Sequence, residues 1–265
     1  KQSALLGTEY RQQFNNGNLE ISGSITQGDK PRNSNRTQII PDQTRGHIFA
    51  KGNFDLNREW RTGFDIAKST DDSYLKTYDY SQEDLLKNSV FVEWLKNRNY
   101  LKAEAFTYED LRPSQTKVQP TIAPTIEYSG YSAPKSLWGG TLRIDANFLN
   151  LFRSKGQDVI RTSSLLGWNR NFISDSGLVA KIETAVRGDL YNVQHSAQNN
   201  NQDKTKLRLF PQIGATVSYP MSKALTSRSE ATIEPIVSLT HAPRMGNDSE
   251  IPNEDSRYTE LDTTN

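Results

Sequence analysis

Apolar and polar residues alternate one by one along most of this chain. The segment 178–190 shows the pattern, because apolar residues occupy one side of an extended strand and charged residues the other. One side carries Leu178, Ala180, Ile182, Val186 and Leu190, and the other carries Lys181, Glu183, Arg187 and Asp189. A period of two is the geometry of a β-strand, which a helix does not produce.

The alternation predicts twelve strands. They span 4–14, 18–27, 46–57, 59–69, 88–96, 99–109, 120–132, 140–153, 158–173, 178–192, 206–219 and 229–242. Strands of soluble sheets usually have about six residues, whereas a tilted strand needs roughly nine to eleven to cross a bilayer. The predicted lengths therefore favour strands that cross a membrane.

Most links between these strands are short and long in turn, but the link 154–157 is short where the pattern expects a long one. The short links are 15–18, 57–59, 96–99 and 174–177, and the long ones are 28–45, 70–87, 110–119 and 194–206. Tight turns at one end and large loops at the other are typical of an antiparallel up-and-down barrel in an outer membrane. The alternative is a soluble β-sandwich or curved sheet that exposes its charged face to solvent.

Composition excludes several classes of protein. The chain has 265 residues, a mean hydropathy of −0.74 and no run of about eighteen apolar residues, which excludes a helical membrane protein. Its formal charge of +1 gives no indication of a nucleic-acid partner. The absence of cysteine excludes disulfides, thiolate nucleophiles and cysteine-bound metals within this sequence.

All four tryptophans fall near the short links. Trp60, Trp94 and Trp168 lie in strands close to these turns, and Trp138 lies in the connection at 133–139. Indole rings favour membrane interfaces, where one end is apolar and the other is wet. We interpret this end of the sheet as one membrane boundary.

Three prolines fall inside predicted strands, namely Pro124, Pro211 and Pro235. Proline removes a hydrogen bond of the strand ladder, so it usually argues against a central strand. Either these strand assignments are wrong locally, or the prolines mark deliberately weakened seams or bulges.

Charged residues follow the polar face along its whole length. The candidates for lining a water-filled interior are Lys102, Arg143, Asp145, Lys181, Glu183, Arg187 and Arg208. Their basic members suit contact with phosphates of a passing ligand. The interpretation that we favour for most of them is pairing with opposite charges on neighbouring strands.

No arrangement of residues indicates an enzyme, a cofactor site or a defined metal site. His47 and His241 fall at strand ends, where we expect a role at the rim, and His195 has no second histidine at metal-binding spacing. Asp71 and Asp72 lie in a long link and are interpreted as solvated loop charges. The acidic stretch 247–256 offers oxygen ligands for Ca²⁺ or Mg²⁺, but its spacing matches no calcium loop.

Several segments, in the same order along the chain, resemble the LPS-assembly protein family LptD. They are Arg45–Phe49, Trp60–Asp65, Asp71–Leu75, Arg187–Tyr191, Phe210–Gln212, Ile233–Ile236 and Asp262–Asn265. The family-signature loop is Ile251, Pro252, Asn253, Glu254, Asp255 and Ser256. The resemblance covers nearly the whole chain and is closest to alphaproteobacterial members.

The resemblance implies an outer-membrane barrel of about twenty-six strands that follows a periplasmic jelly roll. Such a barrel delivers lipopolysaccharide to the outer leaflet, in contact with outer-membrane lipids, an LptE-type plug lipoprotein and periplasmic Lpt bridge proteins. Residues 1–265 would form the N-terminal portion of this barrel, present as a partial, open barrel without the jelly roll and the closing strands. The alternatives are a passive outer-membrane porin and a soluble β-rich binding module.

Overall fold

The computed structural model describes residues 4–31, 39–112, 119–154, 156–194, 203–226 and 229–243. Within these residues lie fourteen β-strands and one short helix, α1 (Tyr74–Thr77). The strands are β1 (Leu5–Phe14), β2 (Gly17–Pro31), β3 (Ile39–Asp55), β4 (Trp60–Ser69), β5 (Leu85–Lys96), β6 (Asn99–Asp110), β7 (Thr121–Tyr131), β8 (Thr141–Phe152), β9 (Asp158–Ile173), β10 (Val179–Gln194), β11 (Lys204–Ser218), β12 (Met221–Thr226), β13 (Ser229–Ile233) and β14 (Ile236–His241). None of the helical residues described is part of a segment long and apolar enough to cross a membrane.

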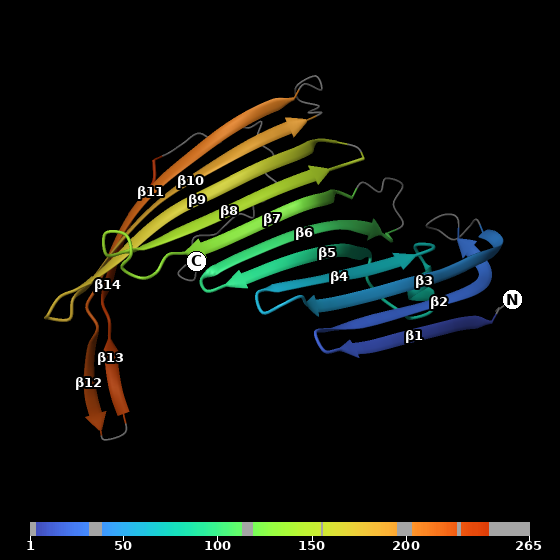
Figure 1. The fold of residues 1–265 in the computed structure, drawn as a ribbon, viewed down its shortest axis with the longest axis horizontal. Coiled ribbons are helices and arrows are strands. Elements are labelled where there is room, and N and C mark those ends of the chain that lie inside the picture. Colours follow the sequence, from blue (N-terminus) through green and yellow to red (C-terminus); the bar gives the residue numbers. More distant parts are fainter. Residues whose placement is uncertain are drawn as a thin grey trace.

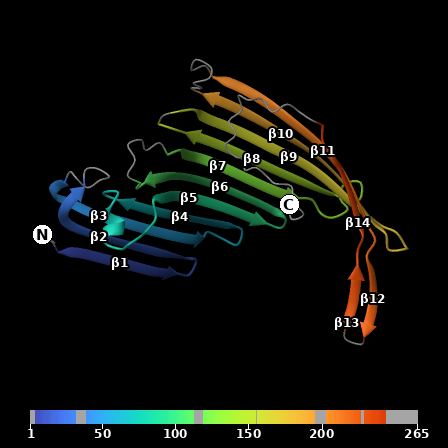
Figure 2. The same ribbon diagram turned by 180° about the vertical axis from the view of Figure 1, so that it is seen from behind.

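Twelve of the described strands form a single antiparallel sheet in the order β1 to β11, followed by β14. Nearly every strand pairs with the next one along the chain, so the topology is up-and-down. In the described part of the chain β1 and β14 are the two edges, and they do not pair with each other. Figures 1 and 2 show this sheet from opposite sides as one long, curved wall. The predicted all-β, up-and-down, partial and open barrel is therefore confirmed.

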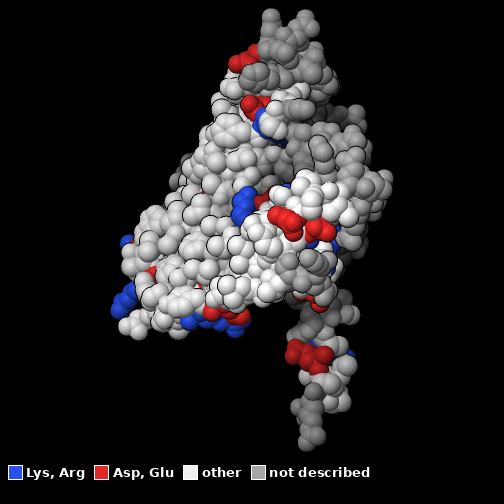
Figure 3. Space-filling view, turned by 90° about the vertical axis from the view of Figure 1, so that its right-hand side faces the viewer, with Lys and Arg blue, Asp and Glu red and all other residues white. Residues whose placement is uncertain are grey.

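The two faces of the wall differ in the way that the alternation predicts. Val186 and Leu190 on β10 are 44% and 46% exposed, whereas Asp189 beside them is fully buried. Leu207 and Leu209 on β11 are likewise exposed on the outer face. Figure 3 shows a broad part of the surface without charged side chains beside a central group of charged ones. An exposed apolar band of this kind is the lipid-facing side of a membrane barrel.

The tryptophans gather at the short-link end of the wall. Trp60 and Trp94 are directly opposite on β4 and β5, with ring centroids 6.2 Å apart. Trp168 on β9 donates a hydrogen bond from Nε1 to the carbonyl oxygen of Leu137 at 2.9 Å, and Trp138 follows in the same β7–β8 link. The predicted segregation of tryptophan is confirmed, and it fits a membrane boundary at this end.

One predicted strand and two predicted links have a different structure. The link expected at 28–45 is much shorter, because β2 continues to Pro31 and β3 begins at Ile39. The strand expected at 229–242 is interrupted, because Glu234 and Pro235 lie between β13 and β14. The residues before it form β12, which pairs with β13 as a separate hairpin that bends away from the wall (Figure 1). Pro235 has no N–H for a strand ladder, and its carbonyl oxygen instead accepts a bond from the amide of Tyr219 at 3.1 Å.

Small apolar cores lie on the concave side, at the long-link end of the wall. One core contains Tyr74 and Leu75 from α1, together with Leu86 and Leu111. A second core contains Leu151, Val159 and Tyr191, from β8, β9 and β10. A wall with its apolar band facing outward thus buries some of its other apolar side chains in local clusters on its inner face.

Candidate functional site

The concave face is the candidate site because it carries all seven predicted interior residues. Asp189 lies opposite Arg208 on β11 and Ser163 on β9, and alternation places Lys181, Glu183 and Arg187 on the same face of β10. Arg161 on β9 donates to Asn147 on β8 at 2.9 Å, which places Arg143 and Asp145 on that face too. Lys102 is connected to this set through the register Lys102–Glu127–Asn147.

Most of these charges pair within one strand. Lys102 binds Glu104 at 3.1 Å, Lys181 binds Glu183 at 2.6 Å, and Arg143 binds Asp145 in the same way. Residues two apart on a strand share a face, so long side chains reach one another easily. The expectation that the charges pair mainly across strands was therefore wrong for these three pairs. Each of the three basic side chains nevertheless has an acidic partner.

Asp189 forms a buried hub on the concave face. Its carboxylate accepts hydrogen bonds from Arg187 Nε at 2.8 Å and from Arg208 Nη2 at 2.7 Å. Arg208 also donates to the hydroxyl of Tyr191 at 2.9 Å, and its guanidinium lies over the rings of Tyr191 and Phe210. A carboxylate with no exposed surface needs such partners, because an unpaired buried charge is strongly unfavourable.

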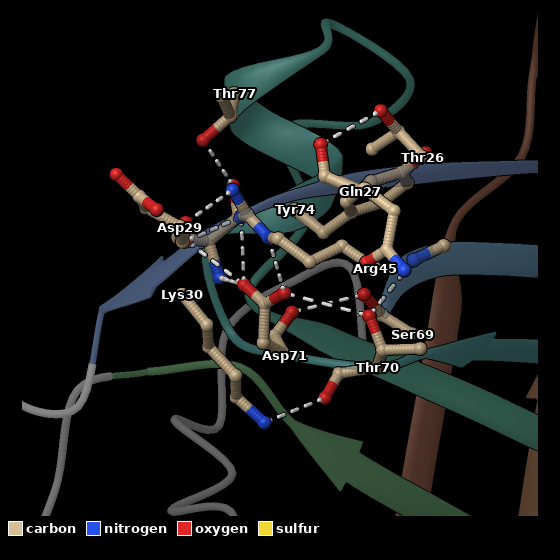
Figure 4. A network of polar contacts seen from close by, with 12 residues as sticks. Thr26, Gln27, Asp29, Lys30, Arg45, Ser69, Thr70, Asp71, Tyr74 and Thr77 are labelled. Atoms are coloured by element: carbon tan, nitrogen blue, oxygen red, sulfur yellow. Dashed lines mark hydrogen bonds and ion pairs between the residues drawn. The ribbon is translucent and has the colours of Figure 1, made fainter. Parts of the chain in front are cut away.

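The long link 70–84 folds inward and is fixed by a second buried ion pair. Arg45 on β3 donates from Nε to Asp71 Oδ2 at 2.8 Å and from Nη2 to Asp71 Oδ1 at 3.0 Å. Arg45 also donates to the carbonyl oxygen of Asp29 (Figure 4). A further hydrogen bond runs from Arg45 to the hydroxyl of Ser73. The two charged side chains are only 6% and 4% exposed. The interpretation of Asp71 as a solvated loop charge was wrong.

The environment of Asp71 shifts its acidity. Burial by itself would raise the pKa of this carboxyl group, but the hydrogen bonds from Arg45 and Ser73 outweigh burial and hold the pKa below its usual value. The neighbouring Gly46 amide donates to the hydroxyl of Thr70 at 2.9 Å, so backbone and side chains together fix the start of the loop.

Helix α1 inserts two side chains completely into the concave face. Tyr74 and Leu75 have no exposed surface. The Tyr74 hydroxyl lies 2.6 Å from Ser24 Oγ, which lies 2.8 Å from His47 Nδ1. The His47 ring also contacts Tyr80, with centroids 4.1 Å apart. Burial raises the pKa of Tyr74. His47 therefore lies inside the wall of β3, and the predicted rim role was wrong.

A separate hollow of about 440 Å³ opens on the concave face over β7 to β10. Its charged lining comes from neighbouring strands and consists of Glu127, Arg143, Asp145, Arg161 and Arg187. Tyr100 on β6 borders it on one side. The sequence predicted Arg143, Asp145 and Arg187 as interior residues, but it did not predict that they line the same hollow.

The three prolines occupy different settings. Pro124 lies in β7 at a shift of register between Ile122 and Thr125, so the predicted bulge is found there. Pro211 lies inside β11 opposite Val186, in an unbroken ladder with β10. Pro235 lies outside the strands, as described above.

Three further expectations concern residues that the structure does not describe. The family-signature loop 251–256 and the acidic stretch 247–256 lie outside the described residues, as does His195. Among the residues that are described, no group of three or more histidine, aspartate or glutamate side chains is arranged to hold a metal ion.

Comparison with protein families decides the assignment. The family model for LptD, described as LPS transport system D, matches residues 43–265. The chain belongs to the LptD family. LptD proteins are β-barrels of the outer membrane that bind lipopolysaccharide, transport and assemble it there, and work with other Lpt components. They form a transport family rather than an enzyme family. A search of curated proteins gave no match.

Proposed function

We propose that the two faces of this LptD wall contact different parts of the lipopolysaccharide molecule. The sugar and phosphate head would pass along the charged concave face, while the acyl chains remain in the membrane beside the apolar outer face. The observation that supports this division is the alternation on β10, where Asp189 is fully buried and the adjacent Leu190 is 46% exposed. The chemistry of each face matches one part of an amphipathic cargo.

Residues 1–265 would form the N-terminal portion of the barrel domain, about strands two to thirteen of a longer wall. By family resemblance, the short links would face the periplasm and the long links the outside. The tryptophans at the short-link end would then mark the periplasmic boundary of the membrane. Loop 70–84 would enter the barrel from the outside.

The partners of this chain would be those of a complete translocon. An LptE-type plug lipoprotein would contact the barrel, and periplasmic Lpt bridge proteins would deliver lipopolysaccharide to it. The energy for transport would come from upstream along that bridge, since no bond is made or broken at this wall. The lumen-lining residues would provide a polar surface and no catalytic group.

Depletion of the full-length protein in its own cells tests the proposal. Surface lipopolysaccharide should fall as the protein is lost, while the protein itself fractionates with the outer membrane and migrates as a heat-modifiable band. A passive porin would give the same fractionation and gel behaviour. Normal surface lipopolysaccharide after depletion would therefore contradict a role in transport.

A further inference from the structure

The hollow over β7 to β10 has the donors that a phosphorylated saccharide needs. Arg143 and Arg187 each bind their own carboxylate through Nε. Their side chains remain 49% and 46% exposed, so terminal amino groups are available at the surface of the hollow. Guanidinium groups bind phosphate through paired hydrogen bonds, which are stronger than those between neutral groups.

Acidic and neutral groups complete the chemistry of the hollow. Glu127 and Asp145 are hydrogen-bond acceptors for sugar hydroxyl groups, and Asp145 is already oriented by a bond from Ser129 Oγ at 2.7 Å. Tyr100 adds a phenolic hydroxyl at the border. The volume of about 440 Å³ falls within the range of about 300–1,000 Å³ that is usual for small-molecule pockets.

Another part of the concave face cannot offer such a surface. Beside β2 and β3, loop 70–84 covers the wall, and Ser24 and His47 are each only 8% exposed. Their polar atoms bind one another and Tyr74, and Phe49 packs against the core that α1 completes. The polar groups of this sector are thus used within the protein.

We infer that the hollow over β7 to β10 is a docking subsite for the phosphorylated saccharide of lipopolysaccharide, and that the sector under loop 70–84 takes no part in docking. The inference rests on the proposed function and adds a location to it. The lipopolysaccharide head would meet the wall on β7 to β10, where three arginines from neighbouring strands line one hollow.

Site-specific photo-crosslinking in the full-length protein tests this location. A benzophenone amino acid replaces Leu165, which lines the hollow without joining an ion pair, or Phe49, which lies under the loop. Irradiated cells are probed for lipopolysaccharide adducts of the protein. We expect adducts at position 165 and none at position 49. Equal adducts at both positions, or adducts at position 49 alone, would overturn the inference.

A charge substitution gives a second, matched readout. Arg143→Gln should lower the adduct yield at position 165 by about two- to fivefold, the effect of losing one half-exposed ionic contact. Arg61→Gln is the control, because Arg61 also binds an aspartate, Asp55 at 3.0 Å, and is 59% exposed on the same face of the wall. It should leave the yield unchanged. Equal yields in the two variants would count against the role of Arg143.

The failure of this inference differs from the failure of the proposed function. If no adduct forms at position 165 while surface lipopolysaccharide still depends on the protein, the hollow is not the subsite and transport stands. If surface lipopolysaccharide does not depend on the protein, the proposed function fails first, and the subsite fails with it.

Discussion

Replacing Asp71 with alanine should release loop 70–84 from the concave face. The change removes the carboxylate that Arg45 binds at 2.8 and 3.0 Å, and leaves a cation whose side chain is 6% exposed. Breaking a buried ion pair on one side usually costs about 3–5 kcal/mol. We expect the lower end, because Ser73 and the carbonyl oxygen of Asp29 still accept hydrogen bonds from Arg45.

A loss of about 3 kcal/mol favours the open loop by roughly a hundredfold. Leu75 reports this opening because it is completely buried and the chain contains no cysteine. A Leu75→Cys protein should react slowly with a water-soluble maleimide. The same cysteine combined with Asp71→Ala should react roughly a hundredfold faster, since local opening controls access to buried groups.

Glu83→Ala is the matched control, because Glu83 is another carboxylate of the same loop and is exposed. Substitutions at such surface positions usually change stability by about 0.5 kcal/mol or less, which corresponds to about twofold in rate. Asp71→Asn should lie between the two, because it removes the charge but keeps an acceptor oxygen. Equal labelling rates in Asp71→Ala and Glu83→Ala proteins would refute the role of the ion pair.

Three further predictions concern loop 70–84 and the strands β10 and β11. The pKa of Asp71 is held below its usual value, so the ion pair stabilises the docked loop fully above about pH 4 and is lost as the pH falls through the lowered pKa. Amide hydrogen exchange in 70–84, corrected for intrinsic rates, should therefore accelerate only at acidic pH. Acceleration already at pH 6 would contradict this prediction. Val186→Arg on the outer face should cost about 2–4 kcal/mol and reduce the heat-modifiable form, whereas Ala185→Arg on the opposite face should assemble normally; equal assembly would argue against lipid contact at Val186. Pro211→Ala should leave the β10–β11 ladder and antibiotic permeability unchanged, because Pro211 already pairs with Val186 without a break of register, and altered permeability with normal assembly would favour a weakened strand instead.

The wall could be predicted from the sequence because its signal is local. The alternation within a strand such as β10 predicts which of its residues lie on each face. The boundaries of β9 were predicted to the residue. The inward fold of loop 70–84 has no such signal. The inward position of the loop depends on Arg45 and Ser24, which are distant from it in the sequence. The sequence alone does not distinguish Asp71, which binds Arg45, from the neighbouring Asp72.

The hairpin β12–β13 could have been predicted from two prolines, although the alternation of apolar and polar residues suggested a continuous strand. Pro220 and Pro235 flank it and interrupt the ladder at the point where it leaves the wall, so proline placement indicates the break better than hydrophobic period does. The hub at Asp189 is a different case. Its charge partners could be listed from the sequence, but its complete burial depends on the register that places Arg208 opposite it.

A cysteine scan along β10 tests most directly whether one face of the wall contacts lipid and the other contacts water. Single cysteines at Ile182, Val186 and Leu190 should be protected from a water-soluble maleimide in intact outer membranes and react with a lipid-soluble one. Cysteines at Glu183 and Ala185, on the concave face, should react with the water-soluble reagent. Labelling that alternates with a period of two is the predicted result, and equal labelling of both sets would contradict the account.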